Sequence, residues 1–277
     1  MIYGGIILYT FELERFVAED LGEDDDSTGI VPEVAAKATI VCKEDGVLAG
    51  LEEACEVCAY FCLATRKRAA DGQAVRKGAV VLEISGSAAG ILRAERLALN
   101  FLGRMSGIAT LTARCVARAG GARVAATRKT TPGFRKFEKK AVKLGGGDTH
   151  RYDLSSAVMI KDNHIAIMGV EGAVAAAKKA ASFTKKVEIE VESVADAVMA
   201  AKLGVDIVMF DNMKPYKFAP AVKKIRQINP RIILEVSGGI TPSNIGDYAK
   251  TGIDVISLGA LTRDAKWLDF SLDMATE

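Results

Sequence analysis

From about residue 121 onward, short runs of β-branched and other apolar residues alternate with amphipathic stretches of helical period. The apolar runs cover 123–127, 157–161, 186–191, 206–210, 231–236 and 254–258. Most intervals between them carry helical patterns, at 135–143, 170–181, 193–203, 216–228 and 242–250. Apolar strands that alternate with helices predict a parallel sheet covered by helices.

The number of these units limits the architecture. Six units, or seven if the irregular stretch 144–156 hides another, are too few for a closed eight-stranded barrel. A doubly wound sheet is the alternative. Its dinucleotide-binding form is disfavoured because no GxGxxG follows a strand.

The first ~100 residues show no such regular alternation. Strand-like runs at 38–43 and 79–85 flank one helical pattern, and turns are expected at Asp45-Gly46 and Asp71-Gly72. A long helical pattern then covers 92–119, with interruptions expected at Gly103 and Gly107. This mixture predicts a small α+β domain ahead of the parallel sheet.

Composition and charge exclude several classes of protein. Hydrophobic residues make up 49% of the chain and charged residues 26%, which excludes a disordered chain, a collagen-like repeat and a coiled coil. With 37 Lys and Arg against 35 Asp and Glu, the net charge of +2 predicts no bulk binding to nucleic acid or to a membrane. The apolar run at 6–9 is too short to span a bilayer and lacks the features of a signal peptide. We therefore expect a cytoplasmic protein.

The five cysteines raise the question of a metal site. Cys55, Cys58 and Cys62 have helical spacing, and Cys42 would supply a fourth thiolate. No second CxxC and no nearby His accompany them, so we favour small apolar residues on a buried helix face.

Chemically useful residues follow each predicted strand of the parallel sheet. In such sheets the active site gathers at the carboxyl ends of the strands, so this regularity predicts a site there. The residues at the strand ends are Arg128 and Lys129, Lys161, Glu190 and Glu192, Asp211 and Asn212, Ser237 with Gly238 and Gly239, and Gly259 with Ala260.

Charge at these ends indicates a small polyanionic substrate. Nine cations against three anions lie in 128–161, although we expect Lys136, Lys139 and Lys140 to form only a solvated helix face. Nucleic acid is not expected, because aromatic residues do not interleave with the charge. The glycine turns at 237–240 and 258–261 suit phosphates, and Glu190 and Asp211 suit ribose hydroxyls and Mg²⁺. These residues predict an enzyme that acts on a phosphorylated sugar with Mg²⁺.

The sequences TRKTTPGFRKFEKKAVKLGGGDTHR (127–151) and MIKDNHI (159–165) resemble quinolinate phosphoribosyltransferase, the decarboxylating nicotinate-nucleotide pyrophosphorylase family. The resemblance extends upstream through 95–112 and downstream through EIEVES, MFDN, EVSGGI and SLGALT. It implies transfer of phosphoribosyl from phosphoribosyl pyrophosphate to quinolinate, giving nicotinate mononucleotide, pyrophosphate and CO₂ in NAD biosynthesis.

The resemblance also implies a fold. An N-terminal α/β sandwich domain with a long connecting helix would cover 1–105, and an open, incomplete parallel α/β barrel of six or seven strands would cover 106–260. The tail at 261–277 would pack back on the N-terminal domain. A homodimer or higher homo-oligomer with shared active sites is expected, in which Arg96 reaches the quinolinate of the neighbouring subunit.

The family's functional residues map onto this chain by type. The quinolinate pocket would consist of Arg96, Arg128, His150, Arg151 and Lys161. The phosphoribosyl pyrophosphate site would consist of Lys129, Glu190, Asp211, Ser237, Gly238, Gly239, Gly259 and Ala260. Of these, Glu190 and Asp211 would hold Mg²⁺, and Lys129, Lys161, Glu190 and Asp211 would be catalytic.

Some positions depart from the family pattern, and two of them bear on the choice of acid. Thr149 stands where the family usually has Asn, and Ala89 where it often has Arg. A paralogue associated with molybdate transport is one alternative, although it usually lacks KDNH. A non-decarboxylating enzyme that uses nicotinate and a non-enzymatic cysteine metal module are the others.

Overall fold

The computed structural model describes residues 10–22, 25–26 and 28–275, so the apolar run at 6–9 lies outside the described residues. The chain forms two compact units. The first combines the described parts of Met1–Leu111 and Ala265–Glu277 with Gly133–Gly145, and the second consists of Thr112–Pro132 and Gly146–Asp264. The expected boundaries differ from this division, because 133–145 belongs with the first unit although it lies within the predicted barrel sequence.

The first unit is built on an antiparallel sheet with the strand order β12-β1-β5-β3. Inward side chains of its central strands are fully buried, among them Ile40 and Leu82, which face each other in register. The strand β12 at the end of the described chain pairs with β1 along its whole length. The strands are β1 (Ala35–Cys42), β3 (Ala64–Lys67), β5 (Val80–Ser87) and β12 (Phe270–Ala275), and a separate pair joins β2 (Gly46–Val47) to β4 (Ala74–Val75).

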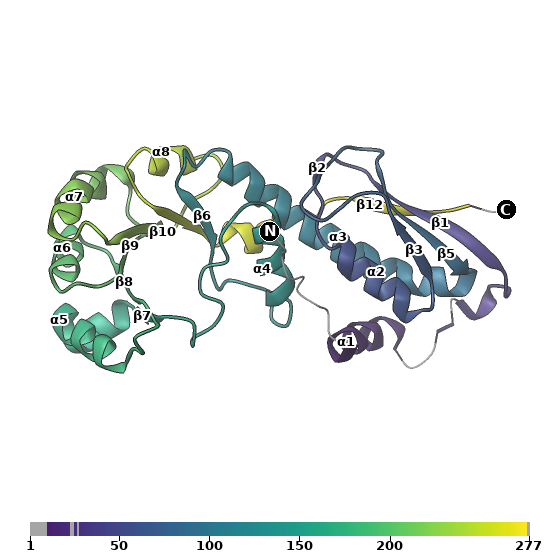
Figure 1. Ribbon diagram of the computed structural model, residues 1–277, viewed down its shortest axis with the longest axis horizontal. Coiled ribbons are helices and arrows are strands. Elements are labelled where there is room, and N and C mark those ends of the chain that lie inside the picture. Colours follow the sequence, from purple (N-terminus) through teal and green to yellow (C-terminus); the bar gives the residue numbers. More distant parts are fainter. Residues whose placement is uncertain (1–9, 23–24, 27, 276–277) are drawn as a thin grey trace. The chain divides into compact units, whose positions relative to one another are not determined.

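Helices α1 (Thr10–Leu21), α2 (Leu51–Tyr60) and α3 (Ala88–Val116) and the short 3₁₀ helix η1 (Thr28–Ile30) complete this part of the chain (Figure 1). The 29-residue α3 continues through Gly103 and Gly107, so the expected interruptions are absent. A Cβ atom at Gly107 would lie 2.0 Å from the carbonyl oxygen of Lys266. Glycine therefore serves here to let the segment before β12 approach the helix, and the helix is not broken.

Helix α4 (Arg135–Leu144) overturns one expectation about exposure. Lys139 is only 1% exposed and Lys140 is buried as well, so the prediction that they form a solvated face is wrong. The Nζ atom of Lys140 lies 2.8 and 3.0 Å from the carboxylate oxygens of the buried Glu53 and 3.6 Å from Asp71. These partners come from distant parts of the sequence, which explains why the helical pattern alone gave the wrong exposure.

The second unit contains a six-stranded parallel sheet with the order β6-β11-β10-β9-β8-β7. This is the order of a barrel in which the first strand pairs with the last, and the opening falls between β6 and β7. The predicted seventh unit in 144–156 is only a β-bridge between Asp148 and Ala125. The strands are β6 (Arg123–Ala126), β7 (Val158–Ile160), β8 (Val187–Val191), β9 (Ile207–Asp211), β10 (Ile233–Ser237) and β11 (Val255–Leu258).

Helices cover the outer side of this sheet (Figure 1). The fold prediction is confirmed in its main feature, an open parallel α/β barrel joined in the chain to a separate antiparallel α/β unit. The helices are α5 (Asp162–Ala180), α6 (Val194–Lys202), α7 (Pro215–Ile228), α8 (Ile245–Ala249) and α9 (Ala260–Arg263).

The described residues do not assemble a thiol metal site. Cys55 and Cys58 lie on α2, whereas Cys62 follows the helix and is exposed. Burial raises the pKa of the Cys58 thiol to about 12, which disfavours the thiolate that a metal needs. The cluster of potential metal ligands found among the described residues contains no cysteine.

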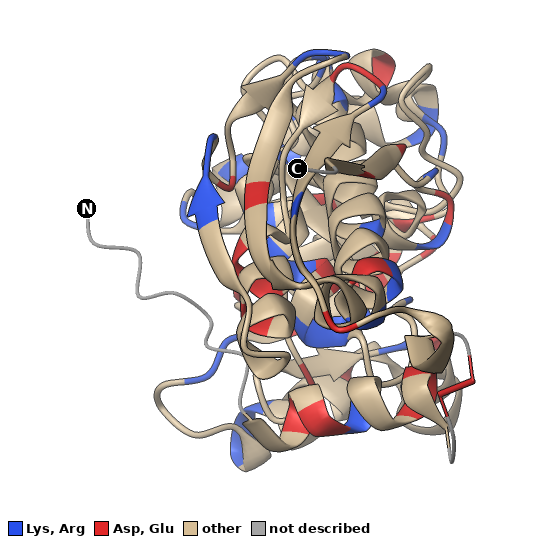
Figure 2. Ribbon diagram, turned by 90° about the vertical axis from the view of Figure 1, so that its right-hand side faces the viewer, with Lys and Arg blue, Asp and Glu red and all other residues tan. Residues whose placement is uncertain are grey.

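Lysine and arginine are interspersed with aspartate and glutamate over the ribbon (Figure 2). Within the part of the chain that the structure describes, no helix has the length and apolar character needed to cross a membrane.

Candidate active site

The predicted site residues on strands of the second unit share one face of the sheet. Side chains two residues apart on a strand point to the same face, so Glu190 lies on the face of Glu188, and Ser237 on the face of Glu235. Glu188 and Glu235 both line a cavity within the second unit. In the sheet register, Ser237 is opposite Asp211 on one side and Ser257 on the other. Glu190, Asp211 and Ser237 therefore lie on the inward-facing side of the sheet, at the carboxyl ends of their strands.

Lys161 and Glu190 form an ion pair at the strand ends. Lys161 follows β7, and its Nζ atom donates to both carboxylate oxygens of Glu190 on β8, at 2.6 and 2.5 Å. The backbone N–H of Lys161 also donates to Nδ1 of His164, at 3.1 Å. Residues 162–164 form the first turn of α5, so Lys161 is the N-cap residue of this helix and its backbone is fixed by the helix.

Four cations, Arg128, Arg151, Lys161 and Lys185, line one cavity of about 310 Å³ beside β7. Arg128 follows β6, Arg151 lies in the segment at the barrel opening, Lys161 follows β7, and Lys185 precedes β8. The Nε atom of Arg128 is buried and has no hydrogen-bond partner in the described structure. A buried donor of this kind is costly unless an acceptor arrives, so the cavity is suited to a ligand with carboxylate groups.

The glycine turn after β10 is shaped by close backbone approach. Gly238 has a φ of +91°, and a Cβ atom there would lie 2.2 Å from Oδ1 of Asn212. The backbone N–H of Asn212 donates to the carbonyl of Ser237, and its side-chain amide donates to Asp211 at 2.8 Å. Only glycine fits at position 238, and the turn ties the ends of β9 and β10 together.

The turn after β11 packs closely against Lys129, whose side chain is exposed. A Cβ atom at Gly259 would lie 2.9 Å from Cδ of Lys129. The hydroxyl of Thr262 on α9 donates to the carbonyl oxygen of Lys129 at 2.7 Å. The turn that contains Gly259 and the buried Ala260 therefore packs against the backbone and side chain of a predicted catalytic lysine.

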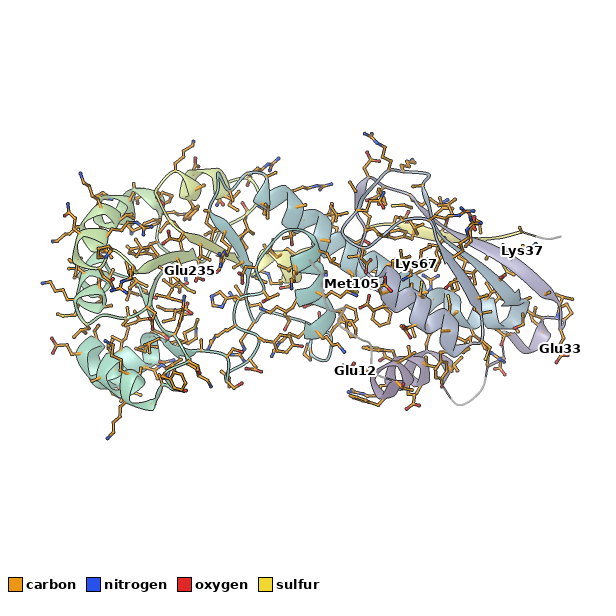
Figure 3. The ribbon with its side chains drawn as sticks, in the orientation of Figure 1. Glu12, Glu33, Lys37, Lys67, Met105 and Glu235 are labelled. Carbon is orange, nitrogen blue, oxygen red and sulfur yellow. The ribbon has the colours of Figure 1, made fainter. Side chains whose placement is uncertain are left out.

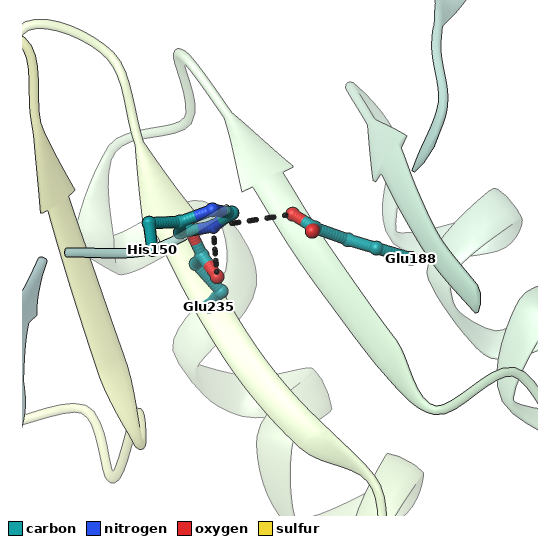
Figure 4. A group of neighbouring side chains, drawn as sticks. All are labelled: His150, Glu188 and Glu235. Carbon is teal, nitrogen blue, oxygen red and sulfur yellow. Dashed lines mark hydrogen bonds and ion pairs between the residues drawn. The ribbon is translucent and has the colours of Figure 1, made fainter. Parts of the chain in front are cut away.

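A buried polar cluster surrounds the ring of His150 (Figure 4). Nε2 of His150 lies 3.1 Å from Oε1 of Glu235 and 3.8 Å from Oε1 of Glu188. The hydroxyl of Ser257 donates to Glu235. Burial, followed by the neighbouring carboxylate of Glu235, raises the pKa of Glu188 to about 8, which opposes ionisation at neutral pH. We refer to these four residues as the His150 cluster.

Sequence reasoning missed Glu188, Glu235 and Ser257. A signal was present, because Glu188 and Glu235 interrupt otherwise apolar strands exactly two residues before Glu190 and Ser237. Charged residues at inward positions of buried strands are rare unless they are paired. The cluster adjoins a second cavity of about 450 Å³, which Arg151 also lines.

The structure brings together only part of the predicted quinolinate pocket. Arg128, Arg151 and Lys161 line one cavity, while His150 lines the other and points to Glu235. Arg96 lies on α3 in the first unit, and its side chain is exposed.

The donor atoms of Glu190 and Asp211 suit Mg²⁺, since both offer carboxylate oxygens from adjacent strands. Each carboxylate also has a protein partner, Lys161 for Glu190 and Asn212 for Asp211. The two residues fit a hard cation by chemical type, with Lys161 competing for Glu190.

Comparison with known proteins supports the same family. The family model for the quinolinate phosphoribosyl transferase C-terminal domain matches residues 108–273, and that for the N-terminal domain matches 20–106. A probable nicotinate-nucleotide pyrophosphorylase [carboxylating] from Archaeoglobus fulgidus is 47% identical over 87% of this chain and 95% of its own length. The corresponding human enzyme is 49% identical over 70% of this chain and 67% of its own.

Solved structures agree with these relatives. The crystal structure of NadC from Streptococcus pyogenes superposes with a TM-score of 0.91 at 42% identity, covering 98% of this chain and 99% of that one. The nicotinate-nucleotide pyrophosphorylase from Francisella tularensis gives a TM-score of 0.91 at 36% identity, covering 96% and 95%. The chain therefore belongs to the quinolinate phosphoribosyltransferase family.

Proposed function

We propose that this chain transfers the phosphoribosyl group of phosphoribosyl pyrophosphate to quinolinate with loss of CO₂. The products are nicotinate mononucleotide and pyrophosphate, which places the reaction in NAD biosynthesis. The observation that carries the proposal is the cavity lined by Arg128, Arg151 and Lys161, with the buried, unpartnered Nε of Arg128. Family membership supplies the chemistry that such a cavity serves.

Quinolinate carries two adjacent carboxylates on a flat ring. The guanidinium and ammonium groups that line the cavity can each meet a carboxylate oxygen, and arginine does so with two parallel donors. Several fixed cations also compensate the desolvation of a dianion in a partly buried cavity. Nicotinate has one carboxylate and would leave part of this charge unpaired.

Phosphoribosyl pyrophosphate would lie across the strand ends beside this cavity. Lys129 would meet its phosphates, Glu190 and Asp211 its ribose hydroxyls, and the turns at Ser237 to Gly239 and at Gly259 and Ala260 would offer backbone N–H groups. The ring nitrogen of quinolinate then attacks the anomeric carbon as pyrophosphate leaves. Acceleration comes from holding the two reactants in line and from fixed positive charge near the leaving group.

Loss of CO₂ follows from the new bond. Once its nitrogen is alkylated, the ring is a pyridinium, which stabilises the electron pair left at C2 when CO₂ departs. C2 then takes up a proton in place of the lost carboxylate. The transfer step needs no general base. The residues of the cavity therefore act by binding, orientation and charge.

Mg²⁺ held by Glu190 and Asp211 would, when bound, neutralise the charge of the leaving pyrophosphate. Glu190→Gln and Asp211→Asn should shift the Mg²⁺ dependence of activity upward, because each removes a charged ligand. Glu192→Gln is the matched control, since Glu192 follows the same strand and is exposed. Unchanged Mg²⁺ curves in both site variants would argue against this metal role.

The active unit would be a homodimer or a larger homo-oligomer with shared sites. The exposed Arg96 of one subunit would then complete the acid pocket of its neighbour. Support comes from the family resemblance and from the position of Arg96 in the first unit, apart in sequence from the cations of the cavity.

Steady-state formation of nicotinate mononucleotide tests the proposed function. Purified protein is supplied with phosphoribosyl pyrophosphate, Mg²⁺ and either quinolinate or nicotinate at equal concentration. Activity with quinolinate and little with nicotinate is expected. Equal use of both acids, or activity with nicotinate alone, would contradict the assignment of a dicarboxylate pocket.

A further inference from the structure

The segment that carries Arg151 has little regular structure to fix it. It follows glycines at 145–147, forms the single β-bridge of Asp148 with Ala125, and continues through 149–152 without helix or strand. It thus occupies the barrel opening between β6 and β7 without a strand ladder. Arg151 nevertheless lines both cavities described above, so contacts other than a strand ladder must place it.

His150 makes three contacts that bear on this placement, each through a different atom. Its backbone N–H donates to Oδ1 of Asp148 at 2.7 Å, and its Nδ1 accepts the backbone N–H of Arg151, also at 2.7 Å. Its Nε2 lies 3.1 and 3.3 Å from the carboxylate oxygens of Glu235. The φ of 53° at His150 turns the chain so that all three contacts form together. The ring therefore connects β10 directly to the backbone of Arg151.

Glu235 is a rigid anchor for this connection. It is 2% exposed and lies on β10, which pairs with β9 and β11 on either side. The hydroxyl of Ser257, on β11, donates to its carboxylate. Glu235 lies on β10, inside the second unit (Figure 3), and its carboxylate meets the imidazole ring directly (Figure 4).

We infer that Glu235, held by Ser257, is a positioning residue that acts through His150 to place Arg151 at the acid-binding cavity. This inference rests on the proposed function, since it assigns to Arg151 the binding of the substrate acid. Glu235 itself does not line that cavity. Its removal should therefore affect the acid and not the phosphorylated sugar.

A bound metal is the rival interpretation of the same residues. One ligand atom each from His150, Glu188 and Glu235 lie within 4.8 Å of one another, and Oε1 of Glu188 is buried without a hydrogen-bond partner. A neutral imidazole has one N–H and one lone pair, however, and here Nδ1 is the acceptor. Nε2 therefore carries the hydrogen and donates to Glu235, whereas a metal would need the lone pair at Nε2.

The first test compares two substitutions of Glu235. Glu235→Leu removes the acceptor for Nε2–H, and Glu235→Gln keeps an oxygen in its place. Glu235→Leu should raise KM for quinolinate by about ten- to a hundredfold and leave KM for phosphoribosyl pyrophosphate nearly unchanged, while Glu235→Gln should change both much less. Ser257→Ala should have an intermediate effect on the acid. Equal losses for both substrates in Glu235→Leu would overturn the inference.

A control separates positioning from general destabilisation. Val236 is the neighbour of Glu235 on β10, but its buried side chain lies on the opposite face of the sheet, so Val236→Ala creates a cavity on that face. It should lower stability without the selective change in KM. If Val236→Ala shifts the KM for quinolinate as Glu235→Leu does, the effect is structural and the inference fails.

A double-mutant cycle with Arg151→Ala tests the route of the effect. If Glu235 acts through Arg151, Glu235→Leu should cost little more for quinolinate once Arg151 is already alanine. A full additional loss in the double variant would show that Glu235 acts by another route.

Nitrogen NMR of the imidazole rings tests the contact without any activity. The chain has only two histidines, so His164→Gln assigns the remaining signals to His150. In the wild type we expect a neutral His150 ring with its hydrogen on Nε2. In Glu235→Leu we expect the preference for this tautomer to be lost. Stoichiometric metal in the purified protein, or a hydrogen on Nδ1, would overturn the inference. An enzyme inactive on quinolinate would instead contradict the proposed function, and the NMR result would still decide on the contact.

Discussion

Nζ of Lys161 donates to both carboxylate oxygens of Glu190, which joins the residue after β7 to the end of β8. The same Lys161 lines the cationic cavity together with Arg128 and Arg151. Its ammonium group is therefore shared between a protein carboxylate and the place proposed for the substrate acid. Binding of an anionic substrate, or of Mg²⁺ at Glu190, would change this sharing, so the two halves of the site are linked through one lysine.

Arg151→Ala should damage the use of quinolinate far more than that of phosphoribosyl pyrophosphate. Loss of a charge-assisted contact worth about 1.5–3 kcal/mol should lower kcat/KM for the acid about ten- to a hundredfold. Arg118→Ala is the matched control, because Arg118 is exposed and donates to a backbone carbonyl outside both cavities. Equal losses for both substrates would show that Arg151 does not act specifically on the acid.

Stability should depend on pH through Glu188. Burial and the nearby Glu235 raise the pKa of Glu188 to about 8, so the folded protein holds a proton that the unfolded chain releases near its ordinary pKa of 4.5. The stability that this proton contributes is fully present below pH 4.5 and is lost as the pH rises toward 8. Glu188→Gln should therefore gain stability over the wild type across this range, with the difference levelling off above about pH 8.

Urea unfolding of both proteins at several pH values measures this difference. Comparing the two proteins cancels the titration of groups that they share. Parallel stability curves for the wild type and Glu188→Gln would show that Glu188 does not hold the proton.

Lys140→Met should destabilise the first unit strongly. It leaves the carboxylates of Glu53 and Asp71 buried without their cation, and breaking a buried pair in this way costs about 3–5 kcal/mol. Lys143→Met, at an exposed position on the same helix, should change the free energy of unfolding by less than about 0.5 kcal/mol. Similar urea midpoints for the two variants would mean that the buried contact contributes little.

Mixing two inactive variants tests the shared site. Arg96→Ala and Lys161→Ala are each expected to lose activity, since both would remove a contact to the acid. In a mixed dimer, one site would receive both defects and the other none, so up to half of the wild-type activity per mixed dimer should return. No recovery after verified subunit exchange would mean that each chain completes its own site.

The sequence predicted the parallel sheet well because its strands are short, apolar and regularly spaced. The run at 206–210 corresponds to β9 at Ile207–Asp211, and the run at 254–258 to β11 at Val255–Leu258. Polar residues at the strand ends then followed from the rule that parallel α/β sheets place their sites there. Glu190, Asp211 and Ser237 share the expected edge for this reason.

Contacts between distant parts of the chain were not predictable in the same way. Lys140 is polar at a helical spacing, and only the fold reveals Glu53 beside it. The His150 cluster likewise depends on the barrel opening, through which a segment without regular structure brings His150 to Glu235. Local pattern identifies elements and the residues at their ends, whereas pairing of buried charges depends on the tertiary structure.

Release of labelled CO₂ tests the central claim most directly. Quinolinate labelled in its C2 carboxylate is incubated with the wild-type protein, Mg²⁺ and phosphoribosyl pyrophosphate, and both CO₂ and nicotinate mononucleotide are measured. The account predicts one CO₂ for each nicotinate mononucleotide, no CO₂ without phosphoribosyl pyrophosphate, and loss of both products together in Arg128→Leu. CO₂ release without the sugar phosphate, or mononucleotide formed without CO₂, would contradict it.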